Sequence, residues 1–389
     1  MTKPLPLSGL TVIEIGHTVA APYAGMILAE LGADVIKIES PGGGDYSRGM
    51  PPFREDGTAS MFQTLNRGKR SVVIDMKDPE EATMLRELIK EKGDVLIHNL
   101  KFGAMDKLGF SAAELLATRP SLVYCNLGAF GHTGPLRDKP GYDPLIQAFT
   151  GIMSIMGEDN RPPVRVGVAI TDMAAGLWAV IGIQAACREA ALTGKGGVVD
   201  TSLFETALGW LSIQYASFDV SGKVPRREGS GVAMLVPYQA FETSDLHIMV
   251  AAGNDNIFRR LCHAVGHPAW ESDERFALNK DRCTNRIELI SLLGDIFKQK
   301  SSEEWLVILE TAGVPASPIN TINQLVDNPQ TKALEILQTS PDGNGTVLGL
   351  PLSFDAVRPP FRTPAPKLGE HTHEVFASIR ARLVGGSAS

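Results

Sequence analysis

Two aspartates stand at the starts of apolar helical patterns, where a carboxylate could take part in chemistry. Asp172 precedes the run MAAGLWAVIGIQ, and Asp143 opens DPLIQAFTGIMSIMG, so their local patterns are equivalent. Aspartate is favoured at helix N-termini, and capping is the simplest interpretation of both. The positive end of the helix dipole also favours the ionised form. An ionised, positioned carboxylate can attack an activated acyl group. We therefore expect Asp172 to cap its helix, to stay ionised and to be able to act as a nucleophile.

Polar side chains also gather where predicted strands end. In an open α/β sheet the carboxyl ends of the strands form the edge that binds ligands. One lysine there is ordinarily a solvated surface residue, but three of them favour a polyphosphate site. The polar residues near strand ends are His17, Thr18, Lys77, Asn99, Lys101 and Lys107.

Neither glycine-rich segment matches a nucleotide motif. The first predicted strand ends in IGHTVAAPYAG, which has only Gly16 where a dinucleotide fingerprint needs three glycines. PGGGD, residues 41–45, fits neither that fingerprint nor a phosphate-binding P-loop, and a surface turn is the simplest interpretation. We therefore do not expect NAD or FAD bound in the usual mode.

Alternating strand and helix patterns predict the fold of the first half. Short apolar runs are followed by segments with helical spacing, an order typical of a parallel sheet with right-handed crossovers. We predict a doubly wound, Rossmann-like α/β domain. The predicted strands are 9–16, 34–39, 71–76, 94–99 and 121–127, and the predicted helices include 20–32, 79–92, 143–157 and one from Asp172 to about 192.

Composition shifts divide the rest of the chain. SGKVPRREGSG has the content of a linker, PYQAFETSDLHIMVAAG predicts two strands around Ser244 and Asp245, and the tail is rich in proline before a last helix. The predicted parts are a large domain at 1–220, a linker at 221–231, a small α/β domain at 232–325 and a return at 326–389.

Composition also narrows the function classes. The net charge of -7 argues against nucleic acid and anionic membranes as partners. The four cysteines lie far apart without metal-ligand spacing, and neither a secretory leader nor an apolar stretch long enough to span a membrane is expected. We expect a metal-free protein of the cytoplasm.

The sequence resembles a known family along nearly its whole length. It is similar to the class III CoA-transferases, the family of formyl-CoA:oxalate and carnitine CoA-transferases. No single motif is decisive, but their number and order are specific. The matching segments are LSGLTVIEIGHTVAAPYAGMILAELGADVIKIESPGGGDYSRG, LNRGKRSVVIDMK, GHTGPLRDKPGYDPLIQAFTG, VGVAITDMAAGLWA, ERFALNKDRCTNR, AGVPASPI and LGEHT.

The resemblance implies a reaction and a site. Asp172 would form a mixed anhydride with the acyl group of the donor and then a thioester with CoA, while Asp143 supports it. CoA and acyl-CoA would be substrates, with no tightly bound cofactor. The CoA site would comprise His17, Thr18, Val19, Ala20, Ile74, Lys77, Asn99, Leu100, Lys101 and Lys107. The family's large domain uses both chain ends, its small domain is inserted, and two chains form an interlocked, ring-like homodimer.

Three departures from the family bear on the substrate. Formyl-CoA transferases have glutamine where this chain has Val19 and arginine where it has Ser40, and their glycine loop has only Gly229, Ser230 and Gly231 as a counterpart. Oxalate and formate are therefore not the expected acids. We expect succinyl-CoA as donor and a small dicarboxylate as acceptor.

Two other functions remain open. An α-methylacyl-CoA racemase shares the family's fold but needs an acid/base pair, and racemases carry histidine where this chain has Tyr142. The usual pKa of tyrosine, near 10, makes it a poor base at neutral pH. A CoA-binding protein without catalysis is the other alternative, which a covalent adduct on Asp172 would exclude.

Overall fold

The structure, a computed structural model, describes residues 4–385 and falls into two compact units. The first consists of Met1–Thr150, Val166–Ser217 and Pro329–Ser389, and the second of Gly151–Arg165 and Phe218–Asn328. The first and last described segments of the chain thus belong to one unit. The segment 151–165, expected in the large domain, groups instead with the second unit.

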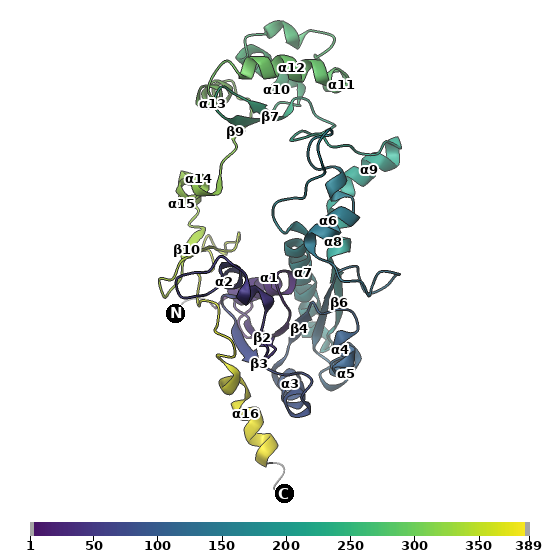
Figure 1. Ribbon diagram of the computed structural model, residues 1–389, viewed down its shortest axis with the longest axis vertical. Helices are drawn as coiled ribbons and strands as arrows, with labels where there is room; N and C mark the ends of the chain where they lie inside the picture. The colour runs from purple at the N-terminus through teal and green to yellow at the C-terminus, as the bar shows by residue number, and fades with distance from the viewer. Residues whose placement is uncertain (1–3, 386–389) are drawn as a thin grey trace. The chain divides into compact units, whose positions relative to one another are not determined.

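The first unit is built on a six-stranded parallel sheet in the order β3-β2-β1-β4-β5-β6. Figure 1 labels β2, β3, β4 and β6 of this sheet. The chain runs outward from β1 to β3, returns to β4, and runs outward again to β6, so the strand order reverses between β1 and β4. This confirms the predicted α/β class with a Rossmann-like sheet. The strands are β1 Thr11–Ile15, β2 Asp34–Glu39, β3 Arg70–Val73, β4 Val95–His98, β5 Val123–Gly128 and β6 Gly197–Ser202.

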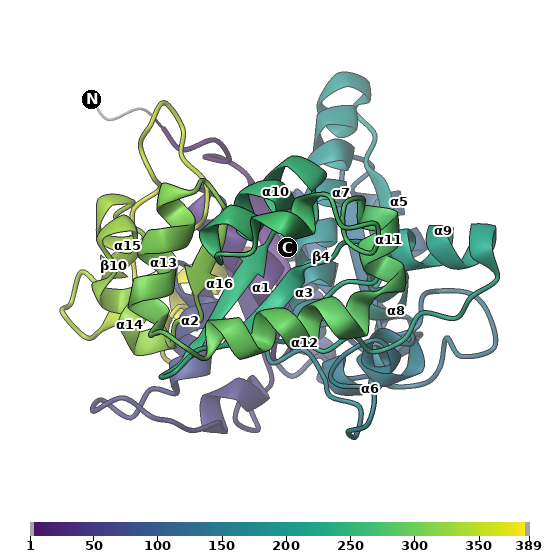
Figure 2. The same cartoon turned by 90° about the horizontal axis from the view of Figure 1, so that it is seen from above.

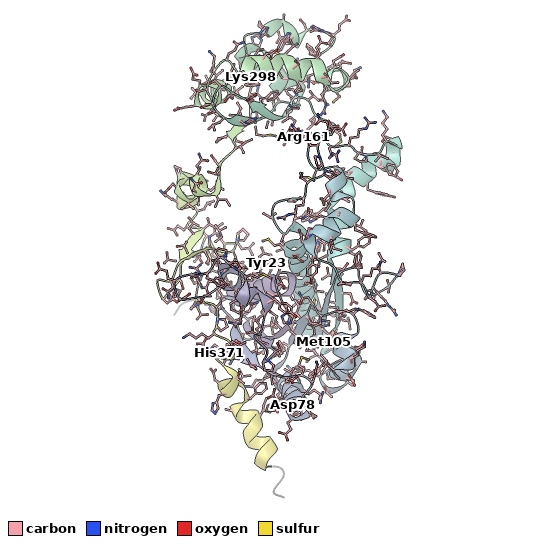
Figure 3. All side chains as sticks on the ribbon, viewed as in Figure 1. Tyr23, Asp78, Met105, Arg161, Lys298 and His371 are labelled. Carbon is pink, nitrogen blue, oxygen red and sulfur yellow. The ribbon has the colours of Figure 1, made fainter. Side chains whose placement is uncertain are left out.

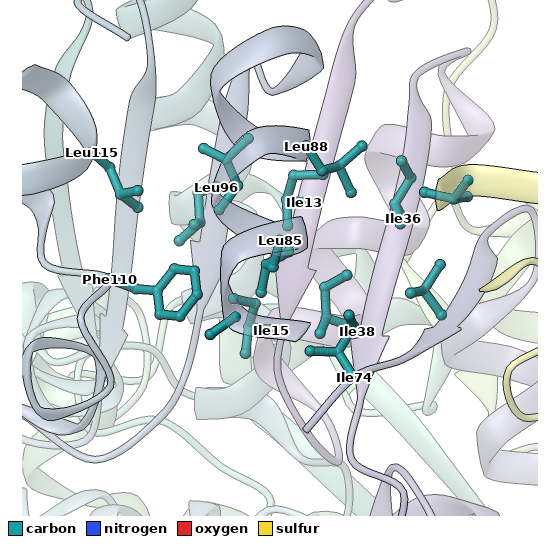
Figure 4. Packing of buried hydrophobic residues seen from close by; sticks show 14 of the residues in the cluster. Ile13, Ile15, Ile36, Ile38, Ile74, Leu85, Leu88, Leu96, Phe110 and Leu115 are labelled. Carbon is teal, nitrogen blue, oxygen red and sulfur yellow. The ribbon is translucent and has the colours of Figure 1, made fainter. Parts of the chain in front are cut away.

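Alternation along β1 separates two groups of helices. Ile13 and Ile15 belong to a core with side chains from α3 (Pro79–Lys92), α5 (Ala112–Thr118) and α16 (Thr372–Gly385) (Figure 4). Glu14 points the other way, toward α1 (Ala20–Glu30), where a Cβ on Gly25 would lie 1.9 Å from its Oε2. The sheet is therefore covered on both faces.

Helix α7 (Ile170–Thr193) is long and apolar enough to cross a membrane, by length and composition alone, which differs from the expectation for the apolar stretches. It packs against α1, and a Cβ on Gly176 would lie 2.8 Å from the Ala20 carbonyl oxygen. The helix ends before Gly194, whose φ of 72° suits a C-terminal cap. In this structure one face of α7 is buried in the first unit, and apolar side chains such as Trp178 are exposed on the rest of the helix.

The long helix predicted at 143–157 is wrong. Helix α6 (Asp143–Phe149) stops before Gly151, whose φ of 93° ends the helical path, and a short 3₁₀ turn, Ile152–Ser154, follows. The sequence analysis also missed several short elements, because a segment of a few residues is too short to display a helical or strand periodicity. The other elements of the first unit are α2 Ser60–Asn66, α4 Ala104–Lys107, α8 Leu203–Trp210, α15 Pro329–Ala333, β10 Leu337–Thr339, β11 Thr346–Leu348 and the 3₁₀ turn Tyr46–Gly49; α9, Ser212–Ser221, runs across the unit boundary.

The second unit has its own sheet and core. Figure 2 labels several of its helices. Its antiparallel strands β7 (Tyr238–Glu242), β8 (His247–Ala251) and β9 (Ala316–Pro318) confirm the predicted pair around Ser244 and Asp245. Its helices are α10 Asp255–Ala264, α11 Asn279–Thr284, α12 Arg286–Phe297, α13 Ser302–Thr311 and α14 Ile322–Asp327, with a 3₁₀ turn at Pro268–Glu271. Arg282 is fully buried and donates to the carbonyl oxygens of Val236 and Gly253.

Candidate active site

A cavity of about 550 Å³ opens at the carboxyl ends of β1, β4, β5 and β6, beside the point where the strand order reverses. Open α/β sheets bind their ligands at this position. Met105, which Figure 3 labels, belongs to its wall. The predicted site residues that line the cavity are His17, Thr18, Val19, Ala20, Asn99, Leu100, Lys101 and Asp172.

Asp172 reaches the cavity from the first turn of α7, but it does not cap that helix. The N-cap position is Ala169, and Asp172 is the third helical residue. Among residues 4–385, no hydrogen bond or ion pair engages its carboxylate. Burial, with a smaller contribution from the negative charge of Asp143, raises the pKa of Asp172 to about 7. The expectation that Asp172 caps α7 is therefore wrong, because the N-cap lies three residues earlier, at Ala169. The raised pKa differs from the expectation that Asp172 stays ionised, because desolvation outweighs the dipole.

Asp143 performs the capping that the sequence assigned to Asp172. It is buried, and its Oδ1 accepts hydrogen bonds from the Thr171 backbone nitrogen at 2.8 Å and from Thr171 Oγ1 at 2.6 Å. Its Oδ2 accepts from Gln147 Nε2 at 2.6 Å. Asp143 is not among the residues that line the cavity. It orders the start of α7 and acts on Asp172 through its charge.

The loop after β1 approaches Asn99 closely. Asn99 Oδ1 accepts from the His17 backbone nitrogen at 3.0 Å, and its Nδ2 donates to the His17 carbonyl oxygen at 2.9 Å. A Cβ on Gly16 would lie 2.9 Å from Asn99 Oδ1, so this contact requires glycine. The His17 ring stacks at a tilt on Tyr46, and burial lowers the pKa of His17. Asn99 thus shapes the predicted CoA loop in addition to lining the cavity.

Three predicted CoA residues lie off the cavity wall. Ile74 is buried in the core beside α3, because its side chain points into the sheet's packed face. Lys77 is exposed in the turn before α3, and Lys107 is exposed at the end of α4. Of the three predicted lysines only Lys101 lines the cavity.

Sequence reasoning missed several residues that line the cavity. Arg137 and Lys139 come from the loop GHTGPLRDKPGYD, and the Arg137 guanidinium lies 4.9 Å from the centre of the Phe102 ring. Their signal was a basic, glycine- and proline-rich loop after a strand, which only the resemblance had singled out. His98 ends β4 within the wall, and burial lowers its pKa to about 4. Exposed basic side chains in the wall, together with a carboxyl group whose pKa is near 7, suit an anionic ligand with a reactive acyl end.

The PGGGD segment is a turn, as its simplest interpretation predicted. Gly43 and Gly44 have φ values of 109° and 72°, and none of its glycines lines the cavity. Asp45, by contrast, is buried and accepts a hydrogen bond from the Thr18 backbone nitrogen. Within residues 4–385, no group of three or more histidine, cysteine, aspartate or glutamate side chains could hold a metal ion.

Comparison with known proteins identifies the class. The model of CoA-transferase family III matches residues 7–372, and the chain belongs to this family and is a CoA-transferase. It is 38% identical to a succinate–glutarate CoA-transferase of Agrobacterium fabrum over 383 residues, 96% of each chain. It is 36% identical to an acetyl-CoA:oxalate CoA-transferase of Acetobacter aceti over 367 residues, 94% of this chain and 93% of that one.

A solved structure is similar over the same extent. A CAIB/BAIF family protein of Brucella suis aligns with a TM-score of 0.86 at 40% identity, covering 98% of this chain and 100% of its own. The resemblance stated from the sequence motifs is thus confirmed at the level of the family.

Proposed function

We propose that this enzyme transfers CoA from an acyl-CoA donor, with succinyl-CoA as the leading candidate, to a small dicarboxylic acid. The observation that carries the proposal is Asp172, a carboxylate without a hydrogen-bond or ion-pair partner among the described residues, in the wall of a cavity at the ligand-binding edge of the sheet. The names of relatives support the acid class: one is a succinate–glutarate CoA-transferase and another, from human, a succinyl-CoA:glutarate CoA-transferase, 34% identical to this chain.

The proposed chemistry begins on one carboxylate oxygen. The ionised Asp172 attacks the thioester carbonyl carbon of the donor, the carbon–sulfur bond breaks, and CoA leaves as the thiolate. The thiolate then attacks the Asp172 carbonyl carbon of the mixed anhydride, which releases the donor acid and leaves an aspartyl-CoA thioester. Because a carboxylate with a raised pKa is more basic, it is a better nucleophile once ionised.

The second half repeats these steps in reverse. The acceptor carboxylate attacks the aspartyl thioester, CoA thiolate leaves, and an anhydride joins Asp172 to the acceptor. The thiolate attacks the acceptor's acyl carbon, which yields the new acyl-CoA and frees Asp172. Water must be excluded throughout, because hydrolysis of either intermediate would waste the activated acyl group.

The cavity suggests how CoA is held. We place the acyl thioester near Asp172 and the nucleotide toward Lys101, Arg137 and Lys139, whose charges suit phosphates. The loop of His17 to Ala20 and the side chain of Asn99 would lie along the CoA chain between them.

We also propose a homodimer of the interlocked type that the family resemblance implies, with the large domain assembled from both chain ends. Apolar side chains are exposed along α7 to α9 of one chain, more than isolated surface residues would account for. The exposed set includes Leu177, Trp178, Ile181, Trp210 and Tyr215. Light scattering of the purified protein tests the dimer, and Trp178→Asp should weaken it. The four free cysteines fit a cytoplasmic location, which cell fractionation tests.

The experiment for the transfer itself incubates the enzyme with succinyl-CoA and a panel of carboxylic acids, and follows new acyl-CoA by mass spectrometry. We expect a product with glutarate or a similar dicarboxylate, and none with Asp172→Asn. A racemase would instead exchange the α-proton of a 2-methylacyl-CoA with deuterium oxide without any acid acceptor. A binding protein without catalysis would give neither product.

A further inference from the structure

Thr18, in the wall of the cavity, has a backbone conformation that its side chain disfavours. Its φ is 68°, in the left-handed region that β-branched residues rarely adopt. Such a conformation persists only where neighbouring groups hold it. The Thr18 backbone nitrogen donates to Asp45 Oδ1 at 3.0 Å, which is the contact that holds it.

Both carboxylate oxygens of Asp45 have polar contacts within the protein. Its Oδ1 also accepts from the backbone nitrogen and Oγ of Ser47, at 2.9 and 2.7 Å, and its Oδ2 lies 2.9 Å from Lys37 Nζ. The Asp45 side chain is fully buried and is not part of the cavity wall. Asp45 is therefore kept from the ligand by its burial, and its direct contact with the loop of His17 to Ala20 is the hydrogen bond from Thr18.

Lys37 connects Asp45 to the other end of the same loop. Its Nζ donates to the Gly16 carbonyl oxygen at 2.9 Å and to Glu14 Oε1 at 2.8 Å, and Lys69 Nζ lies 2.6 Å from Glu14 Oε2. Glu14, Lys37, Asp45 and Lys69 form a fully buried charge cluster with two charges of each sign. The cluster holds Gly16 and Thr18.

We propose that Asp45, supported by Lys37, is a positioning residue of the CoA site that holds the loop of His17 to Ala20 in its binding conformation. The proposal rests on the proposed function, since it takes CoA as the ligand of this cavity. It also gives the PGGGD motif a role: its glycines make the turn that brings Asp45 back under the loop.

A double-mutant cycle with Thr18→Gly tests this role. Glycine adopts a positive φ without help, so the loop should then need Asp45 much less. We expect Asp45→Asn to raise the Kd for coenzyme A, measured by calorimetry, about tenfold or more in the wild-type background. In the Thr18→Gly background the same change should raise the Kd by less than about threefold. Equal penalties in both backgrounds would overturn the proposal.

Two further variants serve as controls for general destabilisation and for failure of Asp45→Asn to fold. Glu30→Gln breaks another buried ion pair, with Arg67, that does not touch the loop, and it should leave the Kd unchanged. If Asp45→Asn does not fold, Ser47→Ala removes one Asp45 partner and should raise the Kd about threefold, with no rise in the Thr18→Gly background. If Glu30→Gln weakens CoA binding as much as Asp45→Asn, the effect is general destabilisation and the proposal fails. If the wild-type protein itself binds no CoA, the proposed function fails first.

Discussion

Two regions of the first unit hold buried carboxylates in opposite electrostatic surroundings. In the buried charge cluster behind the β1–α1 loop, each carboxylate lies within 3 Å of a lysine. At the start of α7, Asp143 and Asp172 have no ion-pair partner among the described residues. Burial alone would raise the pKa of Asp45, but Lys37 and hydrogen bonds hold it well below its usual value, whereas burial and Asp143 raise that of Asp172.

The difference separates structural from reactive carboxylates. A buried carboxylate with a matching cation is permanently ionised and has its lone pairs occupied, so it can hold a backbone but cannot react. Asp172, which has no cation beside it, keeps its proton until near neutral pH and is a stronger nucleophile when it loses that proton. Lys37 and Lys69 thus neutralise the carboxylates behind the β1–α1 loop, whereas no lysine lies beside Asp172 in the described residues.

The largest expected effect follows from substitution of Asp172, the reactive carboxylate. Asp172→Asn should reduce CoA transfer by a factor on the order of 10³ or more, because the nucleophile is lost. CoA binding and the fold should remain largely intact, as calorimetry and circular dichroism would show. An Asp172→Ala enzyme that still exchanges CoA between acids at the wild-type rate would rule out the assignment.

Substitutions in the buried charge cluster should change the stability of the fold. Glu14→Gln leaves two buried lysines short of a partner and should lower the free energy of unfolding by about 3–5 kcal/mol. Glu242→Gln, which breaks the exposed pair with Lys298, should change it by less than about 1 kcal/mol. Chemical denaturation measures both. Equal effects would remove the distinction between the buried cluster and ordinary surface pairs.

Asp172 should also make stability depend on pH. Its pKa rises from 3.8 when unfolded to about 7 when folded, so the folded state binds the proton more tightly. The contribution of Asp172 to stability should therefore be lost as pH rises from about 4 to 7, and Asp172→Asn should lack this contribution. At pH 8 we expect the variant to be more stable by about 2 kcal/mol, below the full value because the carboxylate is partly exposed. Denaturation curves at pH 5 and 8 with the same gap between the two proteins would contradict this.

The smallest expected effect concerns the coupling of the two aspartates. The kcat/KM for transfer should rise with pH through a value near 7 as Asp172 ionises. Asp143→Asn removes one of the two causes of the raised pKa, so the rise should move to lower pH, and turnover should slow as the α7 cap weakens. The pH–rate profiles of the two enzymes measure this. Superimposable profiles would take Asp143 out of the account.

The sequence predicted the sheet and the main site elements because both depend on local pattern. Alternating apolar runs gave the strands, and strand ends placed the loop from His17 and the side chain of Asn99 at the ligand edge, where the structure has them. The family resemblance added Val19, Ala20 and Leu100. What a side chain does once the chain is folded was harder to predict.

The orientation and role of individual site residues could not be predicted, because they depend on contacts between segments that are distant in the sequence. By local pattern Asp143 and Asp172 were equivalent, and only packing decides that Asp143 bonds to Thr171 while Asp172 faces the cavity. Ile74 follows a strand as Asn99 does, but its side chain points into the core. Nothing local marked Asp45 as buried, since its partners Thr18 and Lys37 lie elsewhere in the chain.

The most direct test of the central claim is to trap the intermediate. The enzyme would be mixed with succinyl-CoA, quenched rapidly in acid and digested, and the peptide that contains residue 172 would be analysed by mass spectrometry. We predict a CoA or succinyl adduct on Asp172 that forms within one turnover, disappears when an acceptor acid is added, and is absent from Asp172→Asn. Transfer that proceeds with Asp172 unmodified, or with the adduct on another residue, would contradict the account.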